Sequence, residues 1–175
     1  MNSLPNIDAT YKLSNNLSKL LVELAKDFER RSLQKCHERG HVKIRRSHSS
    51  LFSNLGFGAV RLTELAERAG ITQQAMGKLV KEMERVGYVK RHVDDSDKRA
   101  KIIQLTDIGI TLVNDSMEIV DEVIAEYTVA MGYDGILDLE RVLRKSVTEL
   151  GIACTPSPMN NETEADTETA QSNAA

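Results

Sequence analysis

The chain of 175 residues has few aromatic side chains, few prolines and only two cysteines. Phe and Tyr make up 4% of the sequence, Trp is absent, and three prolines are present. A core must therefore consist mainly of Leu, Ile, Val and Met side chains. Because Cys36 and Cys154 lie far apart in the sequence, we expect no disulfide framework.

Long apolar runs and targeting signals are also lacking. No apolar segment approaches the roughly 20 residues that a membrane-spanning helix needs. The N-terminus has no charged segment followed by an apolar one, so no signal peptide is predicted. We therefore expect a cytoplasmic protein. With 41% hydrophobic residues, the chain is long enough to bury the core of one globular domain.

Positive and negative charge are unevenly distributed between the N-terminal and C-terminal parts of the chain. Residues 1–101 hold 20 Lys and Arg against 12 Asp and Glu, net +8, whereas residues 102–175 hold 3 against 14, net −11. DNA phosphates attract the basic part and repel the acidic part. The charge split favours a nucleic-acid surface in the front half, although charged helix faces are often only solvated.

Two amphipathic segments and a hairpin occupy the middle of the sequence. Thr63 and Thr72 stand where helix N-caps are expected, and Gly70 and Gly87 end the helices. Residues 88–105 then read as two strands around a polar loop. Apolar residues recur at helical spacing in both segments, namely Leu62, Leu65, Ala66 and Ala69, then Met76, Leu79, Val80 and Met83. This order predicts a winged helix-turn-helix.

The flanking segments predict further helices and one more strand. A long first helix ends before Gly40, a second begins near Ser47, and residues 59–61 form a strand that pairs with the wing. Thr106 can cap a long helix whose apolar residues alternate three and four apart, and a last helix covers residues 136–150. The expected fold is mainly α with a small β wing, in which six helices form a winged helix-turn-helix and a dimerisation region.

Three short segments carry a specific resemblance to known proteins. They are residues 61–70 (RLTELAERAG), residues 72–76 (TQQAM) and the wing residues 97–101 (DKRAK), which Leu105, Thr106 and Gly109 follow. Together they resemble the MarR-type transcriptional regulators, and the order of helices extends the similarity more loosely from about Leu13 to about Ile152. The resemblance implies a homodimeric, ligand-responsive DNA-binding protein, most often a repressor.

On this basis the chain divides into a flexible arm (1–10), a MarR-like domain (11–153) and a disordered acidic tail (154–175). Within the domain, the winged helix-turn-helix covers about 42–106, and the dimerisation helices cover about 11–39 and 106–152. We expect a homodimer because these long apolar seams exceed what a monomer core can cover. Its recognition helices would lie roughly 34 Å apart, so the operator would be a palindrome or pseudopalindrome.

Polar side chains on the outer face of the second amphipathic helix suit contact with DNA. Gln73 and Gln74 can bind base edges, Lys78 can reach guanine or phosphate, and Thr72 can hold a phosphate beside free N–H groups. Gly77 allows close approach to the groove floor. The predicted DNA-binding residues here are Thr63, Thr72, Gln73, Gln74, Gly77, Lys78 and Lys81. The alternative is that these Gln and Lys side chains, each considered by itself, belong to an ordinary solvated helix face.

Two further sites flank the helix pair. Arg99, beside Lys98 at the wing tip, resembles the family's wing arginine that enters the minor groove. We expect at least one of Asp94, Asp95 and Asp97 to pair with Arg99 or to cap the turn, with plain turn chemistry as the alternative. A helix start can bind phosphate, so a backbone clamp is predicted at Arg46, Ser47 and His48, and a solvated charge run is an equally good interpretation.

The sequence does not identify an effector site. The resemblance implies a small aromatic or phenolic effector in a cleft between the dimerisation helices and the DNA-binding lobe. Cys36, His37, Glu38 and His41 place metal donors within six residues, but Gly40 interrupts the helix and we expect no metal site and no cofactor. Cys36 as a peroxide-reactive thiolate is a further hypothesis, yet a helical cysteine is more often a small packed side chain.

The sequence features favour one class of function over two others. A DNA-binding regulator is favoured by the order of elements, the polar recognition face and the charge split. The alternative is a winged-helix protein used for protein contacts or non-specific DNA binding, but a scaffold should lack the polar face and Arg99. No nucleophile elbow, phosphate loop, HExxH or paired-carboxylate pattern is present, so we do not expect an enzyme.

Overall fold

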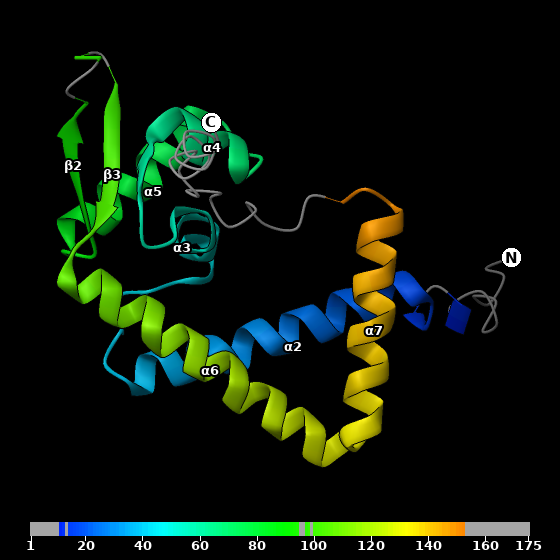
Figure 1. Cartoon of the computed structure of the whole chain (residues 1–175). Coiled ribbons are helices and arrows are strands. Elements are labelled where there is room, and N and C mark those ends of the chain that lie inside the picture. Colours follow the sequence, from blue (N-terminus) through cyan, green and yellow to red (C-terminus); the bar gives the residue numbers. More distant parts are fainter. Residues whose placement is uncertain (1–10, 13, 95–96, 99, 153–175) are drawn as a thin grey trace, which may run out of the picture.

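The computed structural model describes residues 11–12, 14–94, 97–98 and 100–152. Among these residues, six α-helices and a small antiparallel sheet confirm the predicted fold class (Figure 1). The predicted N-terminal arm and acidic tail lie outside the described residues. The elements are α2 (Leu17–Glu38), η1 (Arg46–His48), α3 (Ser49–Leu55), β1 (Ala59–Arg61), α4 (Leu62–Arg68), α5 (Gln73–Arg85), β2 (Val89–Val93), β3 (Lys101–Leu105), α6 (Asp107–Met131) and α7 (Tyr133–Glu149).

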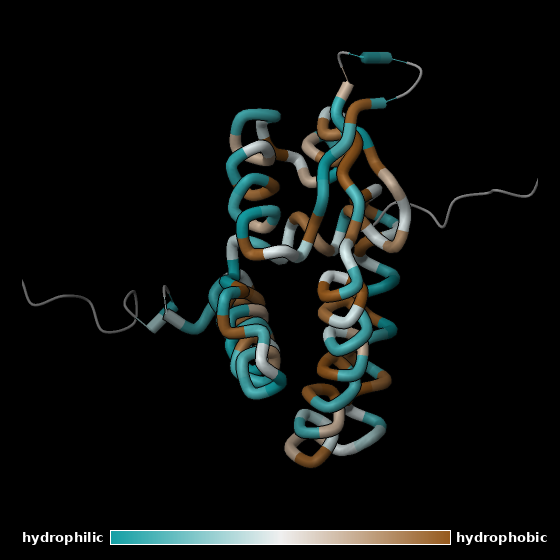
Figure 2. Tube along the Cα trace, turned by 90° about the vertical axis from the view of Figure 1, so that its left-hand side faces the viewer, coloured by the Kyte–Doolittle hydropathy of each residue, from teal (hydrophilic) through white to brown (hydrophobic). Residues whose placement is uncertain are grey.

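The sheet has the strand order β1-β3-β2, with both pairs antiparallel. Val60 lies opposite Ile103, so the predicted pairing of residues 59–61 with the wing is confirmed. Alternation along β1 and β3 places Val60, Ile103 and Leu105 in the core. In β2, only Val89 is buried and the residues from Lys90 to Val93 are exposed. Figure 2 shows this change between apolar and polar positions along the two wing strands.

The two helices of the helix-turn-helix begin in different ways. Thr72 Oγ1 accepts a hydrogen bond from the Ala75 amide at 3.1 Å and caps α5 as predicted. The predicted cap at Thr63 is wrong. Helix α4 begins at Leu62, directly after β1, so the extended residue Arg61 occupies the N-cap position and makes no side-chain cap bond.

Other predicted boundaries shift by a few residues for local reasons. Helix α2 begins at Leu17 because Asn16 Oδ1 accepts from the Lys19 amide at 2.9 Å. The second predicted helix is a 3-10 turn followed by α3. Helix α7 begins at Tyr133, earlier than predicted, because Gly132 alone, with φ of 77°, makes the break and Gly135 lies within the helix.

The core lies beneath α5 and fixes its orientation. Met76, Val80 and Met83 on the inner face of α5 have no exposed surface, and they join Leu65 of α4 and Ile103 of β3 in the same cluster. Buried side chains of this size each stabilise a fold by roughly 1.5–3 kcal/mol relative to their exposed state. The opposite face of α5 is therefore held toward solvent.

Helices α2 and α6 lie side by side below this lobe, and α7 turns back from the far end of α6 (Figure 1). Lys35 of α2 pairs with Glu122 and Glu126 of α6 at 2.9 and 3.0 Å. A hydrogen bond from Lys35, and a smaller contribution from the hydrogen bond of Arg39, lower the pKa of Glu122.

Among the described helices, none combines the length and apolar character needed to cross a membrane.

The wing is joined to α6 by a close backbone contact. Thr106 caps α6 and its amide donates to the Tyr88 carbonyl at 3.1 Å. A Cβ atom at Gly109 would lie only 2.1 Å from that same carbonyl oxygen. Only glycine therefore allows the first turn of α6 to pack against the beginning of the wing.

Candidate nucleic-acid interface

The outer face of α5 brings together most of the residues predicted for the helix-turn-helix. Thr72, Gln73, Gln74, Lys78 and Lys81 are all exposed. Gly77 has helical geometry, and a Cβ atom there would meet nothing within 4 Å. Glycine weakens a helix interior, and packing within the chain does not require a glycine at this position. Without a side chain at Gly77, a large partner can approach this face of α5 closely.

Part of the positive charge on this lobe has no ion-pair partner among the described residues. Among the described residues, no ion pair or hydrogen bond engages the side chains of Lys78, Lys81 and Arg85 on α5, or of Lys90 and Lys101 on the sheet. By contrast, every Lys and Arg of α2 and α7 pairs with a carboxylate. The helix-turn-helix and the wing therefore present an outward positive field.

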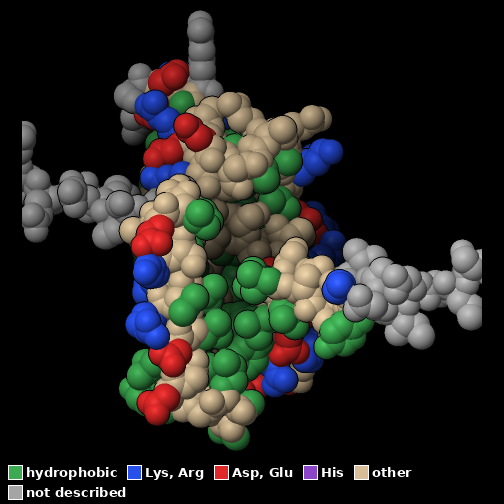
Figure 3. Space-filling view, turned by 90° about the vertical axis from the view of Figure 1, so that its right-hand side faces the viewer, with side chains coloured by type: hydrophobic (Ala, Val, Ile, Leu, Met, Phe, Trp, Pro, Cys, Tyr) green, Lys and Arg blue, Asp and Glu red, His purple; other side chains and the backbone are tan. Residues whose placement is uncertain are grey.

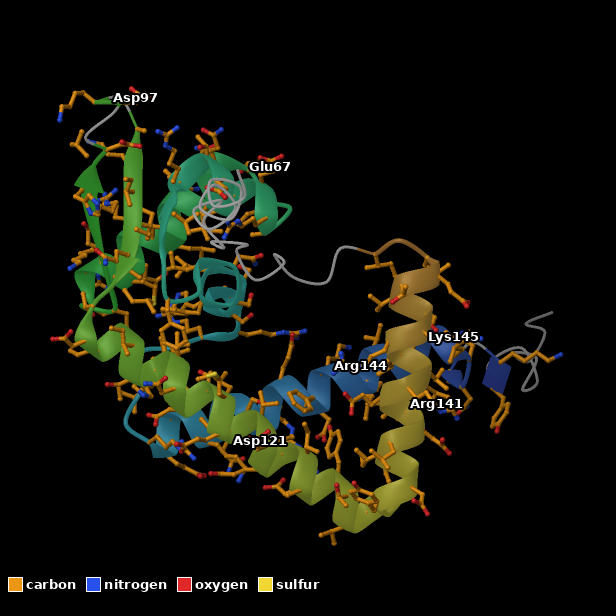
Figure 4. All side chains as sticks on the ribbon, in the orientation of Figure 1. Glu67, Asp97, Asp121, Arg141, Arg144 and Lys145 are labelled. Carbon is orange, nitrogen blue, oxygen red and sulfur yellow. The ribbon has the colours of Figure 1, made fainter. Side chains whose placement is uncertain are left out.

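Asp97 lies at the wing tip (Figure 4), and the side chain of the following residue, Lys98, is exposed. Arg99 and Asp95 lie outside the described residues, so their expected roles stay predictions. The Ala100 amide donates to the Asp97 carbonyl at 2.9 Å, and the Asp94 amide donates to the Ala100 carbonyl at 3.1 Å. These bonds form the turn that brings Lys98 to the tip.

Asp94 has a partner that the sequence analysis missed. Arg61 Nε and Nη2 lie 2.8 and 2.6 Å from Asp94 Oδ2, and the Asp94 side chain is only 10% exposed. The signal was present in the predicted pairing of residues 59–61 with the wing, because that pairing brings Arg61 close to the loop end of the wing, where Asp94 follows β2. Arg61 is therefore a positioning residue for the wing.

The segment predicted to clamp a phosphate through its backbone combines exposed and buried side chains. Ser47 is exposed, whereas the side chain of His48 is completely buried, and the backbone clamp stays a prediction. His48 Nδ1 accepts from the Arg45 amide at 3.1 Å, and its Nε2 lies 3.3 Å from Glu82 Oε2. Arg46 pairs with Glu29 of α2 and so faces the helical base of the molecule. Glu82 and Glu29 are distant in sequence from this segment, so these two side-chain contacts could not be predicted from the chemistry of a helix start.

A cavity of about 420 Å³ lies between α2, α3 and α6. Its walls are mostly apolar, and the charged residues Glu29, Arg45 and Arg46 border it; the apolar lining includes Phe28, Leu33, Phe52, Leu112, Val113 and Met117. The cavity lies where the long helices meet the lobe that holds α5. Its size and lining suit a small molecule with an apolar body.

The residues considered as metal or redox sites make structural contacts instead. Burial, and secondarily Asp115, raises the pKa of the Cys36 thiol to about 11, which favours the interpretation as a packed side chain. His37 Nε2 lies 2.8 Å from the Ile44 carbonyl oxygen. His41 is buried between the Tyr88 hydroxyl, at 3.0 Å, and Asp115 Oδ2, at 2.8 Å.

A comparison with family models concerns the central region. Residues 44–100, which run from just before η1 to the loop of the wing and end before β3, match the model of the MarR family. The match covers the helix pair and the first strand of the wing. No curated protein matches the sequence of the chain.

Solved structures extend the MarR comparison over most of the chain. A MepR variant from S. aureus covers 78% of this chain and 99% of its own, with 22% identity and a TM-score of 0.62. Apo wild-type MarR from E. coli covers 76% and 97%, with 19% identity and a TM-score of 0.63. A MarR variant from E. coli in complex with operator DNA covers 78% and 97%, with 19% identity and a TM-score of 0.63. At these identities the comparison shows that the chain has the fold of MarR-family transcriptional regulators.

Proposed function

We propose that this protein is a sequence-specific DNA-binding transcriptional regulator, acting as a homodimeric repressor that a small ligand or stress signal releases from its operator. The observation that carries the proposal is the set of uncompensated cations on the solvent face of α5, where Lys78, Lys81 and Arg85 have no partner among the described residues. Free Lys and Arg side chains can neutralise phosphates, and the release of counterions then supplies binding free energy.

Sequence selectivity is assigned to the start of the same helix. The exposed amides of Gln73 and Gln74 can bind adenine bidentately in the major groove, and Lys78 can reach guanine acceptors. Thr72 and the first amides of α5 are available to a phosphate. Lys98 and Arg99 would contact the adjacent minor groove from the wing. In the complex of the E. coli MarR variant, a protein of this fold holds operator DNA, which supports the assignment by analogy.

Apolar surface on the long helices supports a homodimer. No residue of α7 is buried within the chain, and Tyr133, Val142 and Leu150 are more than half exposed. Figure 3 views the side that carries α7 and shows hydrophobic side chains gathered there. A second copy of the chain would cover this surface and place two recognition helices about one DNA turn apart.

The cavity between α2, α3 and α6 is the proposed effector site. Its apolar walls, including Phe28 and Phe52, suit the aromatic or phenolic effector expected from the resemblance. Because the cavity touches both the dimerisation helices and the lobe that holds α5, a bound molecule could favour one arrangement of the two over another.

Selection from a pool of random duplexes tests the proposal. The full chain should enrich an inverted repeat with half-site centres one helical turn, roughly 34 Å, apart. A double variant, Gln73→Ala with Gln74→Ala, should fold normally and lose enrichment, because it removes base-reading groups from an exposed surface. Failure of the wild-type chain to enrich any sequence would contradict the proposed function.

A further inference from the structure

The acidic tail (154–175) carries its carboxylates in strict alternation. Residues 162–169 read ETEADTET, and the tail contains no Lys or Arg; the acids are Glu162, Glu164, Asp166 and Glu168. Side chains two residues apart lie on the same side of an extended segment, about 6.6 Å from each other. An extended segment of this sequence therefore presents one row of negative charges about 20 Å long.

The outer face of α5 has the complementary charge and a similar length. Lys78, Lys81 and Arg85 are exposed and lie at i, i+3 and i+7, so they share one side of the helix. None of them pairs with a carboxylate of the described residues. The 13 residues of α5 span about 20 Å. Gly77, beside this row of cations, leaves room for an extended backbone.

The tail follows a helix whose own cations are already paired. Arg141, Arg144 and Lys145 of α7 each pair with a carboxylate of that helix. Figure 1 shows α7 running from the far end of α6 back to the height of α3 in the lobe that holds α5. The 16 residues from Ile152 to Glu168 can extend over about 53–58 Å, whereas the whole 25-residue α6 is only about 38 Å long. The acids can therefore reach α5.

We propose that the acidic tail docks on the outer face of α5 when no DNA is bound and competes there with the phosphates of DNA. The inference rests on the proposed function, because the competitor is the DNA that α5 would bind. The tail carboxylates accept charge-assisted hydrogen bonds from Lys78, Lys81 and Arg85. Four negative charges of the tail meet three positive charges of this face, so docking removes the field that attracts DNA.

Covalent attachment makes a weak contact sufficient. Single exposed ion pairs contribute little in water, but a tethered segment has an effective concentration of about 1 mM. A contact with a Kd of about 0.25 mM then lowers the affinity for any duplex about fivefold. Because salt screens the contact between the tail and α5, the competition weakens as the salt concentration rises. The DNA affinity of the wild-type protein should therefore depend less steeply on salt than that of a protein with an uncharged tail.

Neutralisation of the tail in the full-length protein tests the competition. The tail variant carries Glu162→Gln, Glu164→Gln, Asp166→Asn and Glu168→Gln. In fluorescence anisotropy, its affinity for the selected operator should exceed that of the wild type about fivefold at about 50 mM salt, and less than about twofold at about 300 mM. A scrambled duplex should gain by the same factor, because both duplexes use the same cations. Equal affinities of the two proteins at low salt would overturn the competition.

Matched substitutions separate docking from the overall charge of the chain. Asp166→Asn with Glu168→Gln should give part of the gain in DNA affinity. Asp121→Asn with Glu149→Gln removes the same two charges from α6 and α7 and should leave the affinity unchanged; Figure 4 labels Asp121 and Lys145, the partner of Glu149.

The docking face is tested by removing its cations. In a background with Lys78→Gln and Arg85→Gln, neutralisation of the tail should raise the affinity for DNA by less than about twofold, because the two changes act on one contact. A gain as large as in the wild-type background would show that the tail repels DNA without contacting α5, and would overturn the inference.

Zero-length cross-linking tests the contact in the absence of DNA. A carbodiimide joins a Lys amine and a touching carboxylate as an amide, with loss of water. Mass spectrometry of the wild-type protein should find tail carboxylates joined to Lys78 and Lys81, and saturating operator should abolish these products. Lys35 and Glu122, 2.9 Å apart, provide an internal control that DNA should not affect. Tail products that are absent, or that are spread equally over all exposed lysines, would overturn the inference.

The failures of the two claims are distinguishable. Absence of sequence-selective DNA binding by the wild-type protein at every salt concentration would overturn the proposed function, and with it the competition with DNA. Selective binding that is equally tight in the wild type and the tail variant would overturn the inference alone.

Discussion

The guanidinium group of Arg61 holds the carboxylate of Asp94 through Nε and Nη2, at 2.8 and 2.6 Å from the same oxygen atom. Arg61 ends β1 and directly precedes α4, while Asp94 follows β2 where the wing loop begins. The pair therefore joins the loop end of the wing to the start of the first helix of the helix-turn-helix. This contact restrains the beginning of the wing loop relative to β1 and α4.

Replacement of Asp94 by Asn should loosen the wing more than it destabilises the fold. The loss of a charge-assisted hydrogen bond should lower the free energy of unfolding by about 1–3 kcal/mol, and operator affinity should fall several-fold because the wing tip is less well placed. Denaturant unfolding and anisotropy measure the two effects. The control Asp138→Asn removes an exposed carboxylate of α7 that pairs with Arg141; equal effects of both variants on DNA binding would contradict this role of Asp94.

Lys81 should contribute to phosphate binding. The variant Lys81→Gln removes one uncompensated charge from the outer face of α5, so the slope of log affinity against log salt concentration should decrease in magnitude by about 1. Titrations at several salt concentrations measure the slope. Lys26→Gln removes the same charge from α2, where it pairs with Glu23, and should leave the slope unchanged. A slope unaltered in Lys81→Gln would remove this residue from the interface.

Gly109 and Gly135 should respond in opposite directions to the same substitution. Gly109→Ala places a Cβ atom 2.1 Å from the Tyr88 carbonyl oxygen, so it should cost about 1–3 kcal/mol through forced separation of α6 and the wing. At Gly135, the nearest atom to an added Cβ is Met131 Cβ at 3.4 Å, and Ala should stabilise α7 by about 0.5–1 kcal/mol. Thermal unfolding tests both variants, and a neutral Gly109→Ala would contradict the close contact.

Cys36 should react slowly with thiol reagents. Its pKa, which burial raises to about 11 from an ordinary value of 9.0, leaves the thiolate fraction at pH 8 about a hundredfold lower than in an unfolded chain. Reaction of a Cys154→Ser variant with a disulfide reagent should therefore be slow in the folded protein and fast in denaturant. Rapid modification of the folded protein would instead favour the hypothesis of a peroxide-reactive thiolate.

The elements of the fold were predictable because their signals are local. Thr72 and Thr106 mark helix starts by their own side-chain bonds, and apolar spacing in the sequence identified Met76, Val80 and Met83 as the inner face of α5, which the structure confirms. The same local reasoning placed a cap at Thr63 wrongly. It could not show that β1 continues into α4 without an intervening cap residue.

The relationships that organise the candidate sites could not be predicted in this way. His48 belongs to a basic, polar segment, yet it is buried because Glu82, 34 residues later, lies against it. Arg46 similarly faces Glu29 of α2 rather than the surface of the lobe. Both outcomes depend on how α2, η1 and α5 pack together. The cavity has the same origin, since its lining comes from segments between Phe28 and Val120.

Sequence-specific DNA binding can be measured by fluorescence anisotropy on DNA from the region upstream of the protein's own gene, compared with scrambled DNA at two salt concentrations. We expect tight binding to the upstream DNA, much weaker binding to the scrambled duplex, and a moderate salt dependence from a small number of phosphate contacts. Weak binding that is equal on both duplexes and disappears as salt is raised would contradict this expectation.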